Sequence, residues 1–431
     1  MTALRSMALA VTIASAAAAS ATASQPAQPL TLRQAEQQAV ANHPEVLIGQ
    51  YRAQAGSEGV RQARAVYFPA VVGSVTGADA QSGSRIAAGG LNNPIILDRL
   101  SAGVSASQLV TDFGRTSDLV RSSRLHADAL RQDAITGRAD VLLRVDRTYF
   151  DALRSQAVLR VAQESVRARQ LVVDQVTALA SSGLKSGLDV SFANVNLAEA
   201  QLQLLQAQND RRAAFANLSA ALGSSQAPVY ELADEPLPPP PPTDADTVVA
   251  QALRDRPDVA AERYEHESAA KFADAERALW FPTIAAVAAA GVTPYRQAGL
   301  NSQYSAAGVN VTVPLANGHL FSARRAEASF EALAAQQHVR DLENRVSRDV
   351  RLALLDAQTG FQRLDLTNQL LAHASEALDL ASSRYSLGLS SIVELTQAQL
   401  NQTQAEIAQA SARYEYQAQM SALRYQTGSL K

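Results

Sequence analysis

Four short segments of the chain have the composition of β-strands. Two of them, 100–110 and 304–313, alternate strictly between apolar and polar positions. The apolar positions are Leu100, Ala102, Val104 and Ala106 in the first, and Ala307, Val309 and Val311, continuing to Val313, in the second; Ser101, Gly103, Ser105, Ser107, Gly308, Asn310 and Thr312 lie between them. Such alternation predicts strands with one apolar and one polar face. Ala-, Gly- and Val-rich segments near 68–78 and 283–293 are their weaker partners.

The rest of the pattern is helical. No proline occurs at 95–227 or at 315–431, and proline is excluded from helix interiors. Apolar residues recur every seven positions there: Leu159, Val166, Val173 and Ala180, then Leu364, Leu371, Leu378 and Tyr385. This spacing is typical of helices that pack along their length. It predicts long helices at 116–181 and 318–386, each roughly 100 Å long at 1.5 Å per residue.

The chain carries two copies of one unit. Residue pairs keep an offset of 213 before the strand loops and 205 after them: Pro44/Pro257, Pro69/Pro282, Gly103/Gly308, Gly183/Gly388 and Gly223/Gly428. The sequence therefore predicts a first repeat at 24–234, a proline-rich linker at 235–246 and a second repeat at 247–431. Each repeat is expected to run helix (31–65; 247–279), strand, strand, long helix, tip turn (182–188; 387–392) and returning helix (189–222; 393–427).

Composition adds an export signal and excludes several chemistries. Residues 1–23 combine Arg5, an apolar stretch and an Ala-Thr-Ala cleavage site, as in a signal peptide. Cysteine is absent, so neither a disulfide nor a cysteine-linked lipid anchor is expected. Beyond the signal no run of 18 apolar residues occurs. The net charge is −3, with scattered basic residues, and this argues against a nucleic-acid surface.

The predicted strands suit a membrane. Their length matches a tilted membrane-crossing strand, and their polar faces are Ser, Thr, Asn and Gly with few charges, as in a wet lumen. An ordinary two-faced sheet of a soluble protein is the alternative. Four strands do not close a barrel, and an open sheet edge is not tolerated in lipid. If the strands cross a membrane, several chains must therefore pool them.

Two glycine turns are followed by an acid at the same distance. Asp189 comes six residues after Gly183 in "GLKSGLDV", and Glu394 six residues after Gly388 in "GLSSIVEL". Glycine tolerates the positive φ of a tight turn between helices. An acid here either caps the first turn of the following helix or contributes to a ring of like charges in a narrow pore. Recurrence in both copies favours the pore modestly.

The chain resembles the TolC-like outer membrane factors over about 30–431. The duplicated Phe-Pro strand entries, the long helices, both glycine turns and the C-terminal "ALRYQTGSL" carry the resemblance. It implies a mainly α-helical homotrimer in which each chain gives four strands to a 12-stranded outer-membrane β-barrel and its helices to a periplasmic α-helical barrel. Such proteins are passive exit ducts of tripartite efflux pumps. Their partners are a periplasmic adaptor (membrane fusion protein), an inner-membrane transporter of the RND, ABC or MFS type, and outer-membrane lipid.

The resemblance also assigns site residues. Adaptor docking falls on Ser182, Gly183, Leu184, Leu387, Gly388 and Leu389, and the pore constriction on Asp189, Glu394, Gln397, Tyr385 and Ser390. Family members that lock the tip have a basic residue at the position of Ser390 and a second aspartate at the position of Gln397. Tyr385 is retained. The sequence therefore predicts a constricted tip with a weaker or differently bonded latch.

No catalytic constellation is present in the sequence. Its six histidines lack metal-ligand spacing, and neither a nucleophile elbow nor a phosphate loop occurs. We therefore expect no enzyme activity, no cofactor and no metal site. Two alternatives to an efflux duct remain at this stage: the exit duct of a type I protein secretion system, and a soluble periplasmic coiled-coil adaptor.

Overall fold

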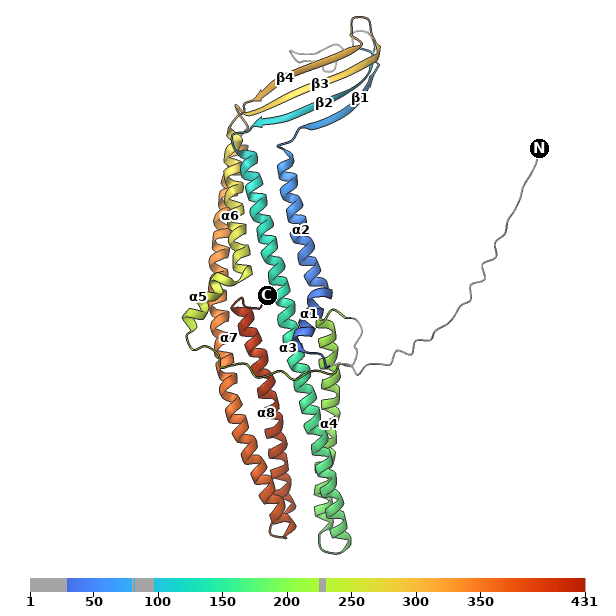
Figure 1. Cartoon of the computed structure of the whole chain (residues 1–431), viewed down its shortest axis with the longest axis vertical. Coiled ribbons are helices and arrows are strands. Elements are labelled where there is room, and N and C mark those ends of the chain that lie inside the picture. Colours follow the sequence, from blue (N-terminus) through green and yellow to red (C-terminus); the bar gives the residue numbers. More distant parts are fainter. Residues whose placement is uncertain (1–28, 80, 82–96, 225–229, 431) are drawn as a thin grey trace, which may run out of the picture.

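The computed structural model describes residues 29–79, 81, 97–224 and 230–430. It is a long molecule with a curved sheet at one end and two helical hairpins at the other (Figure 1). The predicted signal peptide lies outside the described residues, and so does most of the segment between the predicted strands at 68–78 and 100–110.

The sheet contains one pair of strands from each repeat. Its order is β1-β2-β3-β4, and each neighbouring pair is antiparallel. The strands are β1 (Ala70–Ala78), β2 (Arg99–Thr111), β3 (Thr283–Arg296) and β4 (Gln303–Thr312). A bulge between β2 and β3 accommodates Pro294, which has no N–H to give to the ladder. Because β1 and β4 each have one partner, both outer edges of the sheet are unpaired in the single chain.

The register separates the sheet into an apolar and a polar face. Directly paired residues share a face, so Val75 lies with Ala102, and Ser74 lies with Gly103. One face carries Val71, Val75, Val104, Val292 and Val309, and the other carries Ser74, Ser101, Ser105, Asn310 and Thr312. The valines of the first face are exposed; Val75 is 75% and Val309 is 67% accessible. An exposed apolar face of this kind requires a covering partner or lipid.

The helices of the two repeats match one another. The first repeat contains α1 (Leu32–Asn42), α2 (Pro44–Ala65), α3 (Arg115–Ser181) and α4 (Gly187–Ala221). The second contains α5 (Ala245–Asp255), α6 (Pro257–Arg277), a short turn η1 (Ala278–Trp280), α7 (Leu320–Ser386) and α8 (Ile392–Gln426). Both long helices have 67 residues, and both returning helices have 35.

The first helix of each repeat is broken, and this corrects the sequence prediction. A single helix was predicted at 31–65 and at 247–279, but α1 and α2 meet at His43, and α5 and α6 meet at Arg256. Both residues precede a proline and are extended, with ψ of 127° and 128°. The proline ring clashes with a helical conformation at the residue before it, so the helix ends there and restarts at the proline.

The core lies midway along the molecule, where the two repeats and the linker meet. Val141, Val145 and Tyr149 of α3 pack with Leu218 of α4 and Ala39 of α1. The Tyr149 hydroxyl lies 2.8 Å from the Leu30 carbonyl and 2.6 Å from the Ala233 carbonyl, and its one hydrogen is shared between these two acceptors. Within the linker, the Tyr416 hydroxyl of α8 donates to the Pro239 carbonyl. Residues just before the linker are therefore bonded to the first repeat, and the linker itself is bonded to the second.

Two partly exposed arginines pair with one buried glutamate beside the sheet. The Glu276 side chain, at the end of α6, is 1% exposed. Arg324 of α7 lies 2.7 Å from its carboxylate and Arg115 of α3 lies 3.8 Å away. These ion pairs connect three helices at the point where they pass into the strands. In the part of the chain that the structure describes, no helix is sufficiently long and apolar to span a bilayer.

Candidate functional site: the tips of the helical hairpins

Each hairpin ends in the same glycine turn. Gly183 and Gly388 have φ of +74° and +73°. The amide of Leu184 donates to the Leu179 carbonyl, and that of Leu389 donates to the Arg384 carbonyl, at 2.9 and 2.8 Å. This is the Schellman arrangement, which satisfies the last carbonyls of a helix and requires a left-handed residue. The two tips are therefore closed by backbone bonds that glycine makes possible.

The acids after the turns belong to the N-terminal caps of the returning helices. Ser186 caps α4 by accepting from the Asp189 amide, and the Asp189 carboxylate accepts from the Ser186 amide at 3.0 Å. These bonds hold the pKa of Asp189 below its ordinary value. In the second copy, Ser391 accepts from the Glu394 amide at 3.4 Å. A capping box therefore explains the acid of the first copy, whose carboxylate takes part in it, and not the acid of the second.

Glu394 does not complete a capping box; it pairs with an arginine instead. Arg384 Nε, in the last turn of α7, lies 3.3 Å from the Glu394 carboxylate at the start of α8. The pair therefore bridges the two helices of the second hairpin. Its basic member stands four residues before Gly388, so a basic residue at the position of Ser390 is not needed to place a positive charge near Glu394.

Tyr385 couples the second hairpin to the first. Its side chain is 8% exposed and packs with Val176 of α3 and with Ile392 and Leu395 of α8. Lys185, in the turn of the first hairpin, places its ammonium 4.4 Å from the centroid of the Tyr385 ring. A cation over a tyrosine face is attractive, and the contact links the two tips directly. Burial and the charge of Asp189 raise the pKa of the Tyr385 phenol.

The structure thus brings together some of the predicted constriction residues and leaves others apart. Tyr385 and Asp189 lie close, whereas Gln397 is exposed and donates to Asn401 on its own helix. Ser390 has a buried hydroxyl without a hydrogen-bond partner. Lys185 and Arg384 were not predicted. Only three of the 38 basic residues of the chain are lysines, and Lys185 is one of them. This rarity was the one feature of the sequence that could have drawn attention to Lys185.

The predicted docking residues form the free ends of the hairpins. Leu184, Leu387 and Leu389 are 71%, 72% and 68% exposed. Ser182 donates to the Ala178 carbonyl within α3. Three leucines exposed at the end of the molecule farthest from the sheet present an apolar surface that a protein partner can cover (Figure 1).

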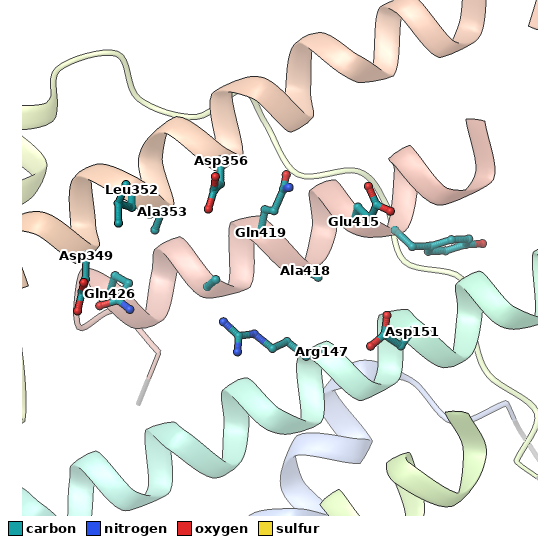
Figure 2. A pocket seen from close by; sticks show the side chains of 12 residues that line it. Arg147, Asp151, Asp349, Leu352, Ala353, Asp356, Glu415, Ala418, Gln419 and Gln426 are labelled. Atoms are coloured by element: carbon teal, nitrogen blue, oxygen red, sulfur yellow. The ribbon is translucent and has the colours of Figure 1, made fainter. Parts of the chain in front are cut away.

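A cavity of about 470 Å³ lies between α3, α7 and α8, farther from the tips and closer to the sheet (Figure 2). Arg147 and Asp151 reach it from α3, Asp349 and Asp356 from α7, and Glu415 from α8. At about 100° per residue, Glu415 and Gln419 lie on the side of α8 opposite to Gln417, whose amide binds the linker carbonyl of Glu235. The linker and this charged cavity therefore occupy opposite faces of the helical layer.

No group of three or more histidine, aspartate or glutamate side chains within residues 29–79, 97–224 and 230–430 is placed to hold a metal ion.

Duplicated helical hairpins continuous with a two-faced sheet define a subunit of a membrane-channel fold. The family model described as "Outer membrane efflux protein" matches residues 35–224 and 248–429. The chain belongs to this family. It is accordingly a transport protein and not an enzyme, and the predicted fold class, helices with membrane strands built from an internal duplication, is confirmed.

Solved structures share the fold at low sequence identity. The chain is similar to CusC, at 18% identity and a TM-score of 0.79, with 92% of each chain covered. It is also similar to VceC of Vibrio cholerae, at 17% identity and a TM-score of 0.78, covering 92% of this chain and 96% of that one. The MtrE channel of Neisseria gonorrhoeae has 19% identity and a TM-score of 0.77, with coverages of 93% and 89%. A comparison with curated protein sequences gives no match.

Proposed function

We propose that the chain is one third of a trimeric exit duct through which a tripartite efflux pump delivers its substrate across the outer membrane. The single observation that carries this proposal is the four-stranded sheet, with one valine-rich exposed face and two unpaired edges. In lipid every backbone polar group needs a partner, so β4 of one chain pairs with β1 of the next. Three copies follow from the resemblance to the TolC-like proteins, and twelve strands close the barrel.

The outer helices of the single chain support the same assembly. Within the chain α3 packs against α8, which leaves α4 and α7 at the two sides of the helical layer (Figure 1). On α4, Leu188, Val195 and Leu202 are spaced seven apart and are 65%, 56% and 67% exposed. On α7, Leu352, Leu366 and Leu380 are spaced fourteen apart and are 52%, 64% and 60% exposed. The heptad-spaced apolar stripe on α4, and the leucines at every second heptad on α7 with Thr359 and His373 between them, fit helix-to-helix contacts between neighbouring chains.

In this assembly the polar face of the sheet and the charged cavity line the lumen. The linker lies on the outer surface of the helical barrel, midway along its length. The hairpin tips form the periplasmic end, where Leu184, Leu387 and Leu389 meet the periplasmic adaptor, which in turn engages the inner-membrane transporter. Tyr385, Lys185, Asp189, Arg384 and Glu394 form the constriction, with Ser390 and Gln397 outside its charged contacts.

Cysteine cross-linking tests the docking end of the proposal. The chain has no cysteine, so a single introduced thiol reports on one position. With Leu389→Cys, a thiol-to-amine cross-linker applied to the periplasm is expected to join the protein to its co-expressed adaptor. The control is Leu315→Cys, because Leu315 is 89% exposed but lies beside the sheet. Equal cross-linking at both positions, or none at Leu389, would contradict adaptor docking at the tip.

Replacing Glu394 by alanine is expected to raise single-channel conductance of the purified protein in planar bilayers. The change removes the partner of Arg384 and loosens the bridge between α7 and α8. Arg384→Ala distinguishes two roles of the acid. If the Arg384–Glu394 ion pair keeps the constriction closed, both variants raise conductance. If the Glu394 carboxylates of the three chains form a ring that holds cations, Arg384→Ala strengthens the block of the channel by cations. Gln397→Ala is the matched control, and a Glu394→Ala channel identical to it removes Glu394 from the constriction.

A further inference from the structure

One aromatic side chain lies on the polar face of the sheet. Tyr304, the second residue of β4, pairs directly with Gly291 of β3, and Gly291 pairs directly with Gly103 of β2. Side chains of directly paired residues share a face, so all three positions belong to the row that contains Ser74 of β1. Tyr295, the other tyrosine of the described strands, pairs with Leu100 beyond the bulge and lies on the opposite face.

The Tyr304 ring occupies the space that side chains at the two glycines would fill. A Cβ built on Gly291 would lie 2.5 Å from Tyr304 Cζ, and one built on Gly103 would lie 3.0 Å from it; both would lie closer still to its hydroxyl oxygen. Such separations are shorter than any ordinary van der Waals contact. The phenol therefore lies flat across β3 and β2 and does not stand away from the sheet. It remains 41% exposed along its outer side.

The glycine in the matching place of the second repeat has no such cover. Gly308 corresponds to Gly103 at the repeat offset of 205, and a Cβ there would meet nothing within 4 Å. Gly73 on β1 is equally open. Contact with Tyr304 is therefore a feature of Gly103 and Gly291 in particular and not of strand glycines in general.

Tyr304 lies near the end of the sheet that is farthest from the helices. The turn between β3 and β4, at 297–302, is at that end (Figure 1), and Tyr304 is the second residue after it. Under the proposed function this end opens to the outside of the cell and the polar face lines the lumen. A tyrosine standing upright there would project into the exit from each chain of the trimer.

We propose that Gly103 and Gly291 hold Tyr304 flat against the lumen wall and thereby set the width of the outer exit. The inference rests on the proposed function, because it requires the polar face to line a pore. Glycine has no side chain to pack within a strand and weakens it, and an aromatic ring laid over it restores contact. In this chain the same contact also keeps the tyrosine ring out of the lumen. The two glycines therefore fix the position of the ring, and the position of the ring sets how wide the outer exit is.

The test measures how fast a reagent added outside the cell reaches a residue inside the lumen. The constriction at the periplasmic end does not limit this rate. Asn310 lies on the polar face, six residues along β4 from Tyr304 and roughly 20 Å deeper at 3.4 Å per residue. In the chain that carries Asn310→Cys, whole cells are treated with maleimides of graded size. N-ethylmaleimide is the small reagent and a polyethylene-glycol maleimide is the large one.

Adding Gly103→Ala is expected to slow labelling by the large reagent several-fold while labelling by N-ethylmaleimide stays unchanged. The new methyl group would also approach the Ala290 carbonyl, at 2.8 Å, so the double change Gly103→Ala/Tyr304→Ala separates the two effects. If the ring narrows the exit, the double change restores labelling by the large reagent to the rate of Tyr304→Ala alone. Gly308→Ala is the control and is expected to match the unmodified exit.

Two outcomes overturn the inference: unchanged labelling with Gly103→Ala, or equally slowed labelling with and without Tyr304. If N-ethylmaleimide still labels Asn310→Cys while either outcome is seen, the polar face lines a pore as proposed. Only the role given to Tyr304 is then wrong. Absence of any labelling at Asn310→Cys, with a trimer assembled in the outer membrane, instead contradicts the lumen assignment and with it the proposed function.

Discussion

Arginine in place of Val104 is expected to prevent assembly of the protein in the outer membrane. Val104 lies in the middle of β2 on the apolar face and is 52% exposed in the single chain. An arginine on the lipid face of a barrel costs about 2–4 kcal/mol at the bilayer midplane, and a trimer carries it three times. Membrane fractionation and the heat-sensitive mobility of the trimer in gels measure the loss.

Ser105→Arg is the matched control for this change. Ser105 is the next residue on the same strand, but it lies on the polar face with Val72 of β1 and Ala289 of β3. The same charge is solvated there, so the protein is expected to assemble, with altered ion selectivity in bilayers. Normal assembly of the Val104→Arg protein would show that the valine-rich face does not contact lipid.

Asparagine in place of Asp146 is expected to remove most of the dependence of stability on pH. Asp146 lies on α3 in the central core and its side chain is fully buried. Its carboxylate makes no well-aligned hydrogen bond, although the Ser421 hydroxyl of α8 lies beside it. The pKa of Asp146 is raised to about 7: burial is the largest cause and the charge of Glu36 on α1 adds to it, while Ser421 and Arg424 of α8 oppose the rise.

The sign of the effect follows from the raised pKa. Folding favours the protonated acid, so the contribution is fully present below the unfolded pKa of about 3.9 and is lost as pH rises towards the folded pKa. Complete ionisation costs about 4 kcal/mol per chain, at 1.36 kcal/mol per pKa unit. Wild-type protein should therefore unfold at lower denaturant concentration at pH 8 than at pH 5.

The measurement is denaturant unfolding of the detergent-solubilised protein between pH 5 and pH 8, followed by helical circular dichroism. Asp146→Asn should flatten the profile and raise the midpoint at pH 8. Asp151→Asn is the control, because Asp151 lies on the same helix, is exposed and pairs with Arg154 at 3.1 Å. An unaltered pH profile in the Asp146→Asn protein would mean that another group governs the pH dependence.

The sequence predicted the strands well because their alternation is a local property. The pattern of Ser101, Gly103 and Ser105 against Ala102 and Val104 appears on the two faces of β2. The bulge at Pro294 was not predicted, since a break in register depends on two strands together. The breaks at His43 and Arg256 were not predicted, because Pro44 and Pro257 served only to align the two repeats and the restriction that a proline places on the residue before it was not applied.

The tip was predicted in outline but not in its contacts. Glycine turns and capping acids are local and could be found from spacing. Lys185 meets Tyr385 across two repeats, and this depends on how the hairpins pack. Arg384 pairs with Glu394 across a turn whose exact length decides the contact. Asp146 was not predicted to be important either. It lies in a helical segment with both polar and apolar residues, and the sequence of such a segment does not show that one of its acids is buried.

The sheet of one chain needs the sheets of its neighbours to pair its two outer edges. Native mass spectrometry of the mature protein, purified in detergent from outer membranes, measures whether those neighbours are present. We expect a single species with three times the mass of the mature chain. A monomer that remains in solution without detergent would mean that the sheet is not completed by neighbouring chains.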